Sequence, residues 1–525
     1  MNKINTAAAK RYFLKLLPLF VILFFYSCKN YHRNSAHQNT SNSSIEKGEA
    51  LAKIYCQSCH MLPDPSLVDS KSWETGVLPE MGPRLGIYGF NFERYPYSRN
   101  KAIGPNFYPA QPIMTFDDWQ NIFNYFVATS PDSMPGQDRK KPIQIGLPLF
   151  KVLLPQLNYS TPATCFVKIN PADSTYPIII GDALKESIYF INRNLGISDS
   201  INKTGPVVNM DFSKENLLAC NIGILNPNDS RAGKGEILRR NGKGKMEKDS
   251  IALIDSLKRP VQLTAADLNN DGKEDYLVCE FGYLTGALSW MENLGNNRFQ
   301  RHVLRNVPGA IKAYVQDYNH DGLPDIWVLF AQGEEGIFLF TNKGNGDFDQ
   351  EEVLRFPPSY GSSYFELADF NKDGYPDIVY TCGDNADYSP VLKPYHGVYI
   401  FMNDKTNHFK QKFFFPINGC YKAIARDFDG DGDLDIATIS FFAQYSKQPE
   451  ESFVYLKNNG NFDFNPYSFP EARLGRWLTM DAGDFDGDGK TDLILGNFSI
   501  GPTKELSAYD WKKGPPFLIL KNMGK

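Results

Sequence analysis

Residues 56–60 read Cys-Gln-Ser-Cys-His and form the most chemically specific pattern in the chain. Cys-x-x-Cys-His is the attachment pattern of a c-type haem, in which each thiol adds across one vinyl group of the macrocycle. Cys56 and Cys59 are therefore the predicted covalent attachment points, and His60 is the predicted axial iron ligand. The pattern predicts a haem c cofactor and, with it, electron transfer.

Two other kinds of site also use paired cysteines, a redox-active dithiol and a zinc site. A thioredoxin-type pair follows a buried strand, whereas this pair follows residues 45–55, whose pattern is helical. A zinc site needs further ligands, and no second cysteine pair lies nearby in the sequence. Haem is therefore the favoured interpretation.

The second axial ligand has two main candidates, Met81 and Met114. Residues 115–129 are predicted to form the last helix of the haem domain, and Met114 would pack against its Trp119. Met81 lies in a stretch expected to be irregular, and residues 73–86 resemble the Trp and Met segment that follows the haem motif in some small bacterial cytochromes c. Met81 is the predicted ligand, with Met114, another ligand or an open position as alternatives. A Met/His pair suits electron transfer better than gas chemistry.

Residues 1–28 have the form of a bacterial lipoprotein signal peptide. Basic residues precede an apolar run at 16–26, which is too short to cross a bilayer. Cys28 follows a small residue at the end of this run and is the predicted lipidation site, although ordinary cleavage with an incidental cysteine is the alternative. Residues 29–44 are polar and are expected to form a tether. We therefore predict an exported lipoprotein, anchored on the periplasmic or cell-surface side of a bacterial membrane.

The composition sets broad limits on the class of protein. The 525 residues leave room for two or three domains, and 42% hydrophobic residues are ample for packed cores. The net charge is −5 and no basic patch is apparent, so nucleic acid is not an expected partner. An odd number of cysteines remains after Cys28, Cys56 and Cys59, which argues against a disulfide scaffold. Four of the remaining five lie in apolar strand-like runs and are expected to be buried thiols: Cys165, Cys220, Cys279 and Cys382.

The second half of the chain repeats one nine-residue pattern, Asp-x-Asn/Asp-x-Asp-Gly-x-x-Asp. The five copies start at Asp267, Asp317, Asp369, Asp427 and Asp484, about 50–60 residues apart. Oxygen-bearing side chains at this spacing, around a glycine that permits a sharp turn, favour a calcium loop. Solvated acidic turns are the alternative. The loops are not EF-hands, because the twelfth position lacks glutamate and strand-like runs follow in place of helices.

Each loop joins two apolar runs, and two more runs follow it. Four strands in a unit of about 50 residues predict the blade of a β-propeller. Two further units without acidic loops, at 163–193 and 207–257, bring the number of blades to seven. The last unit ends one strand short, and residues 149–154 would supply its outer strand and close the ring.

The expected architecture is thus a small all-α cytochrome c domain followed by an all-β seven-bladed propeller. The predicted boundaries are 45–135 for the haem domain, 136–148 for a linker and 149–525 for the propeller.

The repeats resemble the FG-GAP/VCBS propeller family, whose blades form integrin heads and occur in many secreted bacterial proteins. With the haem motif and the leader, the whole chain resembles VCBS-repeat lipoproteins with an N-terminal cytochrome c domain. The resemblance implies architecture more firmly than activity, because such propellers serve adhesion, ligand binding and occasionally catalysis. It also implies calcium ligands in each loop, from side chains at positions one, three, five and nine and from a backbone carbonyl at position seven: Asp267, Asn269, Asp271, Lys273 and Asp275; Asp317, Asn319, Asp321, Leu323 and Asp325; Asp369, Asn371, Asp373, Tyr375 and Asp377; Asp427, Asp429, Asp431, Asp433 and Asp435; Asp484, Asp486, Asp488, Lys490 and Asp492.

Two groups of propeller residues are candidates for a ligand or substrate site. One group starts the inner strands and would ring the central opening, where it could bind an anion or a sugar: Arg259, Lys312, Tyr364, Tyr421, Lys422, Arg476 and Trp477. The other is the polar insertion 383–397, with Asp384, Asp387, Lys393 and His396 as possible acid–base groups. In both groups the alternative is a purely structural role.

The sequence therefore predicts a lipid-anchored c-type haem electron-transfer protein with a calcium-stabilised propeller that binds or docks a carbohydrate or protein ligand. A redox partner protein is expected. The alternative is an oxidoreductase whose propeller oxidises a carbohydrate or other small substrate while the haem accepts the electrons. Pure adhesion is the weakest interpretation.

Overall fold

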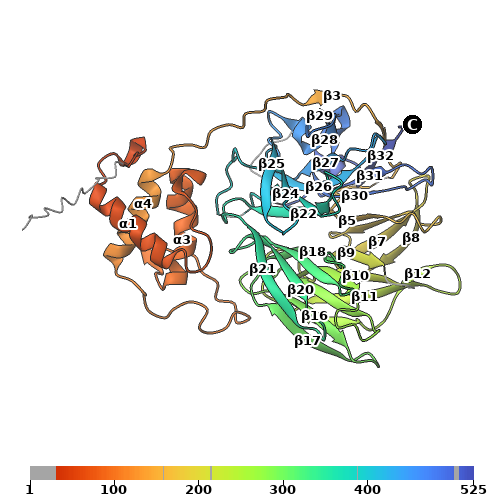
Figure 1. Ribbon diagram of the computed structural model, residues 1–525, viewed down its shortest axis with the longest axis horizontal. Helices are drawn as coiled ribbons and strands as arrows, with labels where there is room; N and C mark the ends of the chain where they lie inside the picture. Colours follow the sequence, from red (N-terminus) through yellow and green to blue (C-terminus); the bar gives the residue numbers. More distant parts are fainter. Residues whose placement is uncertain (1–30, 158, 213–215, 387, 502–507, 525) are drawn as a thin grey trace, which may run out of the picture.

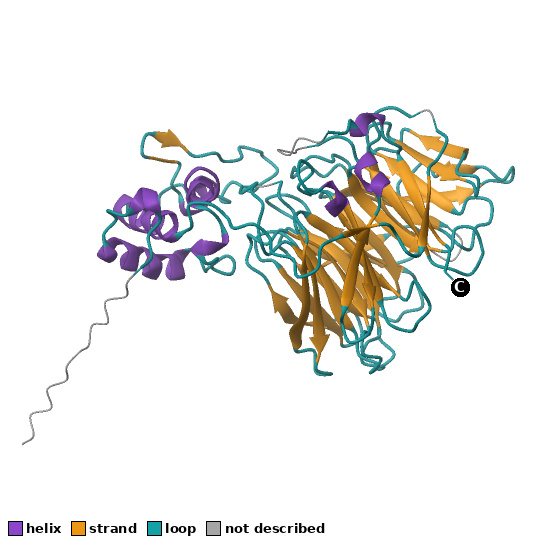
Figure 2. Ribbon diagram, turned by 90° about the horizontal axis from the view of Figure 1, so that it is seen from above, coloured by secondary structure: helices purple, strands orange, loops and turns teal. Residues whose placement is uncertain are grey.

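The computed structural model describes residues 31–157, 159–212, 216–386, 388–501 and 508–524. The predicted signal peptide and Cys28 lie outside the described residues. A helical domain comes first in the chain and lies beside a much larger all-β domain (Figure 1). Figure 2 shows the same two parts from a second direction, with the longer helices at one side of the sheets and a few short helical turns among the strands. No helix within the described ranges is both long and apolar enough to cross a membrane.

The helical domain packs two long helices against each other, α1 (Asn42–Tyr55) and α4 (Phe116–Thr129). Each begins at a hydroxyl N-cap, because the Ser41 side chain accepts from Ser44 N and the Thr115 side chain from Asp118 N. Shorter elements complete the domain: α2 (Ser70–Ser72), α3 (Leu78–Met81) and the hairpin of β1 (Gly89–Phe90) and β2 (Glu93–Arg94). Its core contains Met114 together with Trp119, as the sequence predicts.

The stretch around Met81 differs from the sequence prediction, because it is helical and not irregular. A π-helical turn, Trp73–Val77, joins α2 to α3, and a 3-10 turn, Gly82–Leu85, follows. Pro79 would normally break a helix by clashing with the carbonyl four residues earlier. Here it lies at the start of α3, directly after the wider π turn, where that clash is relieved. Gly86 ends the run in the left-handed conformation, at φ +76°.

The predicted tether also differs in its described part, residues 31–44. Asn34 is 4% exposed and donates from Nδ2 to the carbonyls of Val127, at 2.5 Å, and Ser130, at 3.1 Å. Its own backbone N–H bonds to Ala128 O. The last carbonyls of a helix lack partners within the helix, and Asn34 supplies donors to this end of α4. The helical domain therefore begins before residue 45.

The β domain consists of seven sheets of four or five strands. The first two blades are β5 (Thr164–Ile169), β6 (Ile178–Asp182), β7 (Ser187–Ile191) and β8 (Ile197–Asn202), then β9 (Val207–Phe212), β10 (Leu217–Asn221), β11 (Gly233–Arg240), β12 (Met246–Lys248) and β13 (Ile254–Leu257). Blades three to five are β14 (Pro260–Ala266), β15 (Asp275–Glu280), β16 (Ala287–Asn293) and β17 (Phe299–Arg305); β18 (Ala310–Gln316), β19 (Asp325–Phe330), β20 (Gly336–Asn342) and β21 (Phe348–Arg355); and β22 (Ser362–Ala368), β23 (Asp377–Cys382), β24 (Gly397–Asn403) and β25 (Phe409–Pro416).

The last two blades show how the ring closes. They are β26 (Cys420–Arg426), β27 (Asp435–Ser440), β28 (Phe453–Asn458) and β29 (Phe464–Ser468), then β30 (Trp477–Gly483), β31 (Asp492–Asn497), β32 (Phe517–Asn522) and, from before the first blade, β4 (Phe150–Leu153). β4 pairs antiparallel with β32, so the predicted closure by residues 149–154 is confirmed. The seven-bladed propeller predicted from the repeats is confirmed with it.

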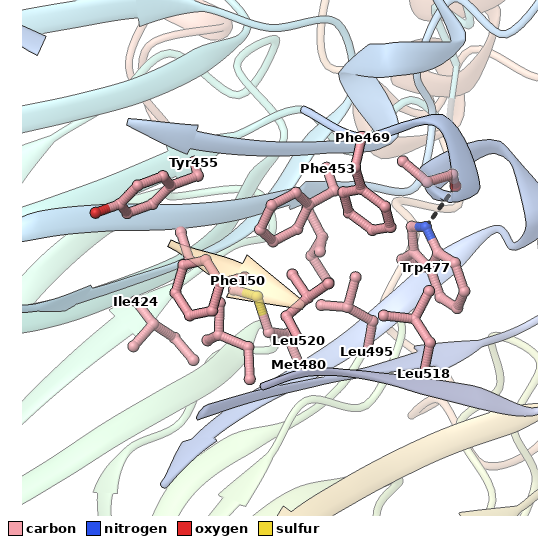
Figure 3. Packing of buried hydrophobic residues seen from close by; sticks show 14 of the residues in the cluster. Phe150, Ile424, Phe453, Tyr455, Phe469, Trp477, Met480, Leu495, Leu518 and Leu520 are labelled. Atoms are coloured by element: carbon pink, nitrogen blue, oxygen red, sulfur yellow. Dashed lines mark hydrogen bonds between the residues drawn. The ribbon is translucent and has the colours of Figure 1, made fainter. Parts of the chain in front are cut away.

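The core next to the closing strand is apolar and rich in aromatic rings (Figure 3). The Phe150 ring lies edge-on to Tyr455 at 5.4 Å, and Trp477 Nε1 donates to Ala472 O at 2.7 Å. Burying Phe150 in this cluster ties the strand to its blade by apolar area as well as by backbone pairing.

The outer edge of the second blade departs from the prediction. Four strands are expected in the unit 207–257, but the blade has five, because β12 and β13 are separate and both pair with β11. β12 follows directly after the short turn at 241–245 and forms the first part of the outer edge of the blade. This edge is then interrupted between β12 and β13.

The predicted linker, 136–148, is attached to the propeller. Its β3 (Gln144–Ile145) pairs in parallel with β29. Arg139 donates from Nε to Pro416 O at 2.8 Å and forms an ion pair with the fully buried Glu451. A buried carboxylate is costly unless it is paired, so this contact fixes the linker to the rim of the ring.

Candidate functional site

A cavity of about 620 Å³ lies between the helical domain and the propeller. This volume is in the range of small-molecule and cofactor sites. Cys56, Cys59, His60 and Met81 all line it. The structure therefore brings the predicted haem ligands together at one cavity.

The end of α1 positions the Cys-x-x-Cys-His motif. Cys56 is the C-cap of this helix, with its backbone N–H bonded to Ala52 O, and Ser58 Oγ donates to Tyr55 O at 2.7 Å. The turn leaves Cys59 exposed and Cys56 half-buried. Burial, with a smaller contribution from Cys59, raises the pKa of the Cys56 thiol to about 12, so Cys56 is a neutral thiol. Neither cysteine forms a disulfide.

The His60 ring is held in one orientation. Its Nδ1 lies 2.9 Å from Met61 O, and because a carbonyl only accepts, Nδ1 carries the proton. The Nε2 lone pair is then left for a metal. Burial lowers the pKa of His60, which keeps the ring neutral and able to act as a ligand.

The two candidate methionines have different surroundings. Met81, the last residue of α3, lines the cavity. Met114 is 8% exposed and packs in the core of the helical domain.

The two walls of the cavity differ in chemistry. The helical wall is mostly apolar and includes Val68, Leu78 and Leu85 as well as Trp73 and Trp119. The polar atoms of both indoles are bonded elsewhere, Trp73 Nε1 to Pro65 O and Trp119 Nε1 to Tyr95 Oη.

The propeller wall of the cavity is more polar. It comes from the loops that follow the second strand of a blade or join one blade to the next, and includes Lys258, Thr285, Gln332 and Glu334. The acidic loops follow the first strand of a blade. Because adjacent strands are antiparallel, the two sets of loops lie on opposite faces of the ring. The helical domain and the acidic loops thus occupy different faces of the propeller.

The polar insertion 383–397 forms part of the contact between the domains. Tyr395 Oη donates to Leu67 O at 2.8 Å. A Cβ on Gly76 would lie 2.1 Å from Tyr388 O, so only glycine permits this approach. Close packing against the helical domain explains much of the insertion's length.

Among the predicted acid–base groups of the insertion, Lys393 is engaged in holding it together. Lys393 Nζ donates to Asn385 Oδ1 at 2.8 Å and to Ser389 O at 2.9 Å. His396 is 1% exposed, and burial lowers its pKa. Burial also raises the pKa of Asp384. Asp387 lies outside the described residues.

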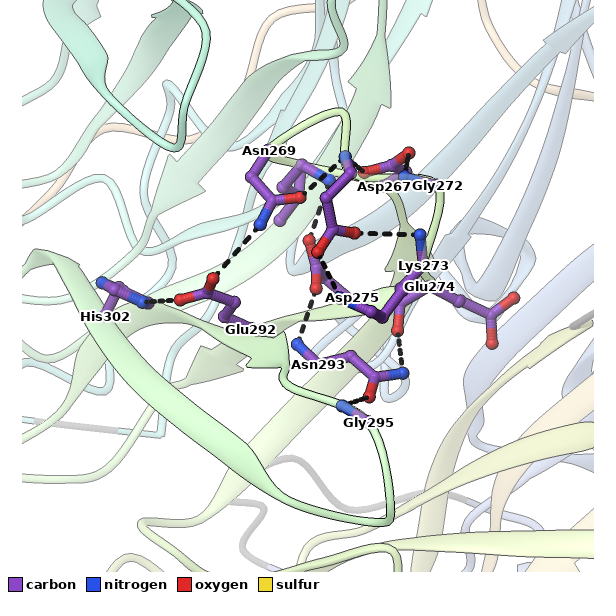
Figure 4. Close-up of polar contacts among 12 residues, drawn as sticks. Asp267, Asn269, Gly272, Lys273, Glu274, Asp275, Glu292, Asn293, Gly295 and His302 are labelled. Carbon is purple, nitrogen blue, oxygen red and sulfur yellow. Dashed lines mark hydrogen bonds and ion pairs between the residues drawn. The ribbon is translucent and has the colours of Figure 1, made fainter.

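The first acidic loop is held in a turn by its own carboxylates (Figure 4). Asp267 accepts from Asp271 N at 3.0 Å and from Gly272 N at 2.8 Å. Asp275, at the ninth position, is fully buried and accepts from Asn293 N at 2.7 Å. Gly272 has φ +83°, which explains the glycine at the sixth position.

The other four loops repeat this arrangement. The ninth-position carboxylates are 0% exposed, and each accepts from the backbone N–H of an asparagine at the end of the third strand of the blade; the pairs are Asp275 and Asn293, Asp325 and Asn342, Asp377 and Asn403, Asp435 and Asn458, and Asp492 and Asn522. Burial raises the pKa of all five carboxyls, to about 6 for Asp377 and Asp435 and about 7 for Asp492. These asparagines were not predicted from the sequence. Each stands at the same place, just before the turn that follows the third strand of its blade, so a usable signal was present.

Two loops differ from the other three in charge. Their third position is Asp in place of Asn, and a lysine on the third strand contacts it, Lys457 at Asp429 and Lys521 at Asp486. In each of the same two loops, three carboxylates bring their oxygens within 4.8 Å of one another. Asp486 Oδ1 is buried and has no hydrogen-bond partner among the described residues. An unpartnered buried carboxylate oxygen fits a cation site, because burial without a partner is costly.

Two of the seven residues predicted to ring the central opening are placed elsewhere, because Trp477 lies in the core beside the closing strand and Tyr421 packs against Phe441. The other five divide into two sets. The Arg476 guanidinium is 1% exposed and donates to Phe441 O and Ile500 O, and Arg259 donates to Leu225 O and Gly282 O. These two arginines have structural roles. Lys312, Tyr364 and Lys422 instead lie at matching positions on inner strands.

Comparisons with known proteins agree with the repeat architecture. A family model described as an FG-GAP-like repeat matches residues 317–380. Cartilage acidic protein 1 of Mus musculus is 31% identical over 174 residues, which are 32% of this chain and 26% of that protein. The Xenopus tropicalis protein of the same name is 31% identical over 200 residues, 35% of this chain and 29% of that protein. The chain thus spans between a quarter and a third of the length of these curated relatives.

Among solved structures, a streptogramin B lyase superimposes with a TM-score of 0.44 and 11% identity, covering 71% of this chain and 98% of that one. The N-terminal domain of Nup159 gives a TM-score of 0.40 and 11% identity, covering 73% and 99%. At such low scores these likenesses imply nothing about activity. The chain is a protein with a seven-bladed β-propeller that contains FG-GAP-like repeats.

Proposed function

We propose that this protein is a c-type haem electron carrier whose haem lies between the helical domain and the propeller. The observation that carries the proposal is the convergence of Cys56, Cys59, His60 and Met81 on one cavity of about 620 Å³. A bound haem c would supply one-electron chemistry at its iron.

The chain's own residues would attach, orient and shield that group. Cys56 and Cys59 would supply the two thiols for covalent attachment, and His60 would donate from Nε2, since its Nδ1 is engaged with Met61 O. The apolar helical wall would exclude water, which favours a higher reduction potential. Met81 is the better candidate for the second axial position because it lines the cavity.

A test of this proposal uses the absorption spectrum of the full-length protein made in cells that attach haem c. The wild type should show a low-spin spectrum in both redox states. The His60→Ala variant should keep covalent haem but lose the low-spin spectrum, because the axial nitrogen is gone. A low-spin spectrum that persists in His60→Ala would overturn the ligand assignment.

The polar propeller wall favours a second candidate function, in which a carbohydrate or other small molecule is oxidised at the propeller and the haem accepts the electrons. Lys258, Gln332 and Glu334 face the same cavity as the haem ligands. Reduction of the haem band by candidate sugars or alcohols under anaerobic conditions would support this function. If none reduces it, simple electron carriage to a redox partner protein is the better description.

We also propose that the five acidic loops bind calcium and that the ions stabilise the propeller. The support is the repeated loop geometry, together with the unpartnered Asp486 Oδ1. Chelation should lower the melting temperature of the propeller and spare the helical domain, because only the propeller carries the loops. An unchanged melting curve in excess chelator would contradict the proposal.

Export and a lipid anchor at Cys28 complete the proposed function. Their support is the leader pattern of residues 1–28. Metabolic labelling with a fatty acid, lost in Cys28→Ser, is the test.

A further inference from the structure

The inner strands of the propeller place two lysines at equivalent positions in the central channel. Lys312 on β18, Tyr364 on β22 and Lys422 on β26 each follow the same break in strand register, in three consecutive blades. Because inner strands of a propeller surround its axis, side chains at one register position form one layer of the channel.

The two ammonium groups lie beside the same aromatic ring. Lys422 Nζ, from the blade that follows the Tyr364 blade, is 4.8 Å from the centroid of the Tyr364 ring. Lys312 Nζ, from the blade that precedes it, is 5.9 Å from the same centroid. Lys312 Nζ is also 4.5 Å from the ring of Tyr314. Cation–π contacts hold the two groups in place but accept none of their N–H bonds.

Their hydrogen-bonding capacity is largely unused. Lys422 Nζ donates to Met480 O at 2.7 Å, which leaves two of its three donors. Lys312 Nζ has only its cation–π contacts among the interactions found within the described residues. Burial lowers the pKa of both lysines, to about 8 for Lys422, and their proximity to each other contributes to the lowered pKa of Lys422. A counter-ion would relieve both costs.

The carboxylates of the channel are already committed to joining blades. Asp211 accepts from Ala265 N at 2.9 Å, and Asp481 accepts from Ile169 N at 2.8 Å.

A third carboxylate, Glu366, accepts from Ala425 N at 2.7 Å and pairs with Arg426 at 2.9 Å. Lys168 approaches Asp481 at 3.5 Å. The other charged groups that face the two lysines are therefore two cations, Lys168 and Arg426, and three carboxylates. Each of the carboxylates already has a partner. The channel retains an excess of positive charge at Lys312 and Lys422.

We propose that the central channel of the propeller binds a small anion with at least two oxygen acceptors, an oxyanion or a carboxylate, between Lys312 and Lys422 and against the ring of Tyr364. Two ammonium groups beside one tyrosine ring attract such an anion and present donors to it. The site is separate from the haem cavity and does not depend on the proposed electron transfer.

Calorimetric titration of the full-length protein with inorganic phosphate, and separately with acetate, at constant ionic strength tests the site. The wild type should bind phosphate saturably, and Lys312→Met and Lys422→Met should each bind at least tenfold more weakly. Lys343→Met is the matched control, because Lys343 pairs with Asp349 on the outer side of a blade at 3.2 Å. The control should bind like the wild type. Binding of acetate as well would assign the site to carboxylates in general.

A second measurement guards against variants that fail for another reason. Removing one of two neighbouring ammonium groups while keeping its apolar stem should leave the melting temperature unchanged or raise it, because the repulsion between them is lost. Phosphate should then raise the melting temperature of the wild type and of Lys343→Met but not that of Lys312→Met. The proposal is overturned if wild-type protein shows no saturable phosphate binding, or if both lysine variants respond as the wild type does.

Discussion

At the scale of single residues, the proposed haem site depends on side chains whose orientation is fixed before any ligand arrives. His60 has its Nδ1 engaged by Met61 O, so only Nε2 can bind iron. Cys56 caps α1, so the motif starts where the helix ends. Preorganised ligands of this kind lower the entropy lost on binding.

Substitution of the predicted axial methionine tests the assignment within the cavity. Met81→Ala should keep covalent haem but lose the weak sulfur-to-iron band at the red end of the oxidised spectrum. The reduction potential should fall by on the order of 100 mV, because a thioether ligand favours the reduced iron. Met114→Ala is the control and should keep the band. Loss of the band in Met114→Ala alone would show that the ligand choice is wrong.

Lys521 gives a second test at the residue scale, of the proposal that the last acidic loop binds calcium. Its ammonium contacts Asp486 and lies 3.4 Å from Asp488, both partly buried. Without calcium, Lys521→Met should therefore destabilise the last loop by about 1 kcal/mol, through unrelieved repulsion between carboxylates. In excess calcium the difference should shrink, because the ion replaces the ammonium charge. Equal melting temperatures of variant and wild type in chelator would contradict this account.

The Cys-x-x-Cys-His pattern could be recognised from the sequence because its residues are neighbours in the chain. Cys56, Cys59 and His60 lie within five positions, and spacing alone identifies them. Lys521 was not predictable in the same way, because it acts on a loop from a neighbouring strand. Such contacts depend on strand register, which a single loop sequence does not contain.

At the scale of elements, the blades follow from apolar runs of strand length with turns between them. The strands and their order were largely predictable, including the outer strand β4 from the start of the domain. The π turn at Trp73–Val77 was not, because proline and glycine near Met81 suggested irregular backbone. A widened turn accommodates that proline without ending the helix, and sequence patterns do not report this.

Ring closure gives the prediction at this scale. A propeller that starts at residue 155 lacks β4 and exposes the edge of β32, whereas one that starts at residue 147 keeps the pair. The shorter form should aggregate and melt at a lower temperature, since an exposed strand edge pairs with other chains. Size-exclusion chromatography and thermal melting compare the two. Equal solubility and stability would mean that β4 is dispensable for closure.

At the scale of the whole molecule, the helical domain and the propeller share one cavity. This could not be predicted from sequence, because the propeller wall is assembled from loops of several blades and the docking depends on Gly76 and the insertion 383–397. The seven-bladed count, by contrast, follows from the repeats themselves. If the proposed haem occupies the shared cavity, charges on the propeller should influence it.

Glu334 provides the test of that influence. It lines the cavity, pairs with Arg305 and with Arg355 at 3.3 Å, and contributes to the electrostatic environment of His60. Glu334→Gln should raise the reduction potential by on the order of tens of mV, because loss of a negative charge destabilises oxidised iron. Glu352→Gln is the control, since Glu352 also lies near Arg355, at 3.8 Å, but is a residue of β21. Equal shifts in the two variants would contradict a shared site.

The central claim is that haem is covalently bound through the two thiols of the motif. The most direct measurement is the haem content of the denatured full-length protein after acid–acetone extraction, read from its pyridine haemochrome spectrum. We predict one haem per chain, retained in the wild type and lost in the Cys56→Ala, Cys59→Ala double variant. Haem that extracts from the wild type, or a wild type that holds zinc and no haem, would contradict the account.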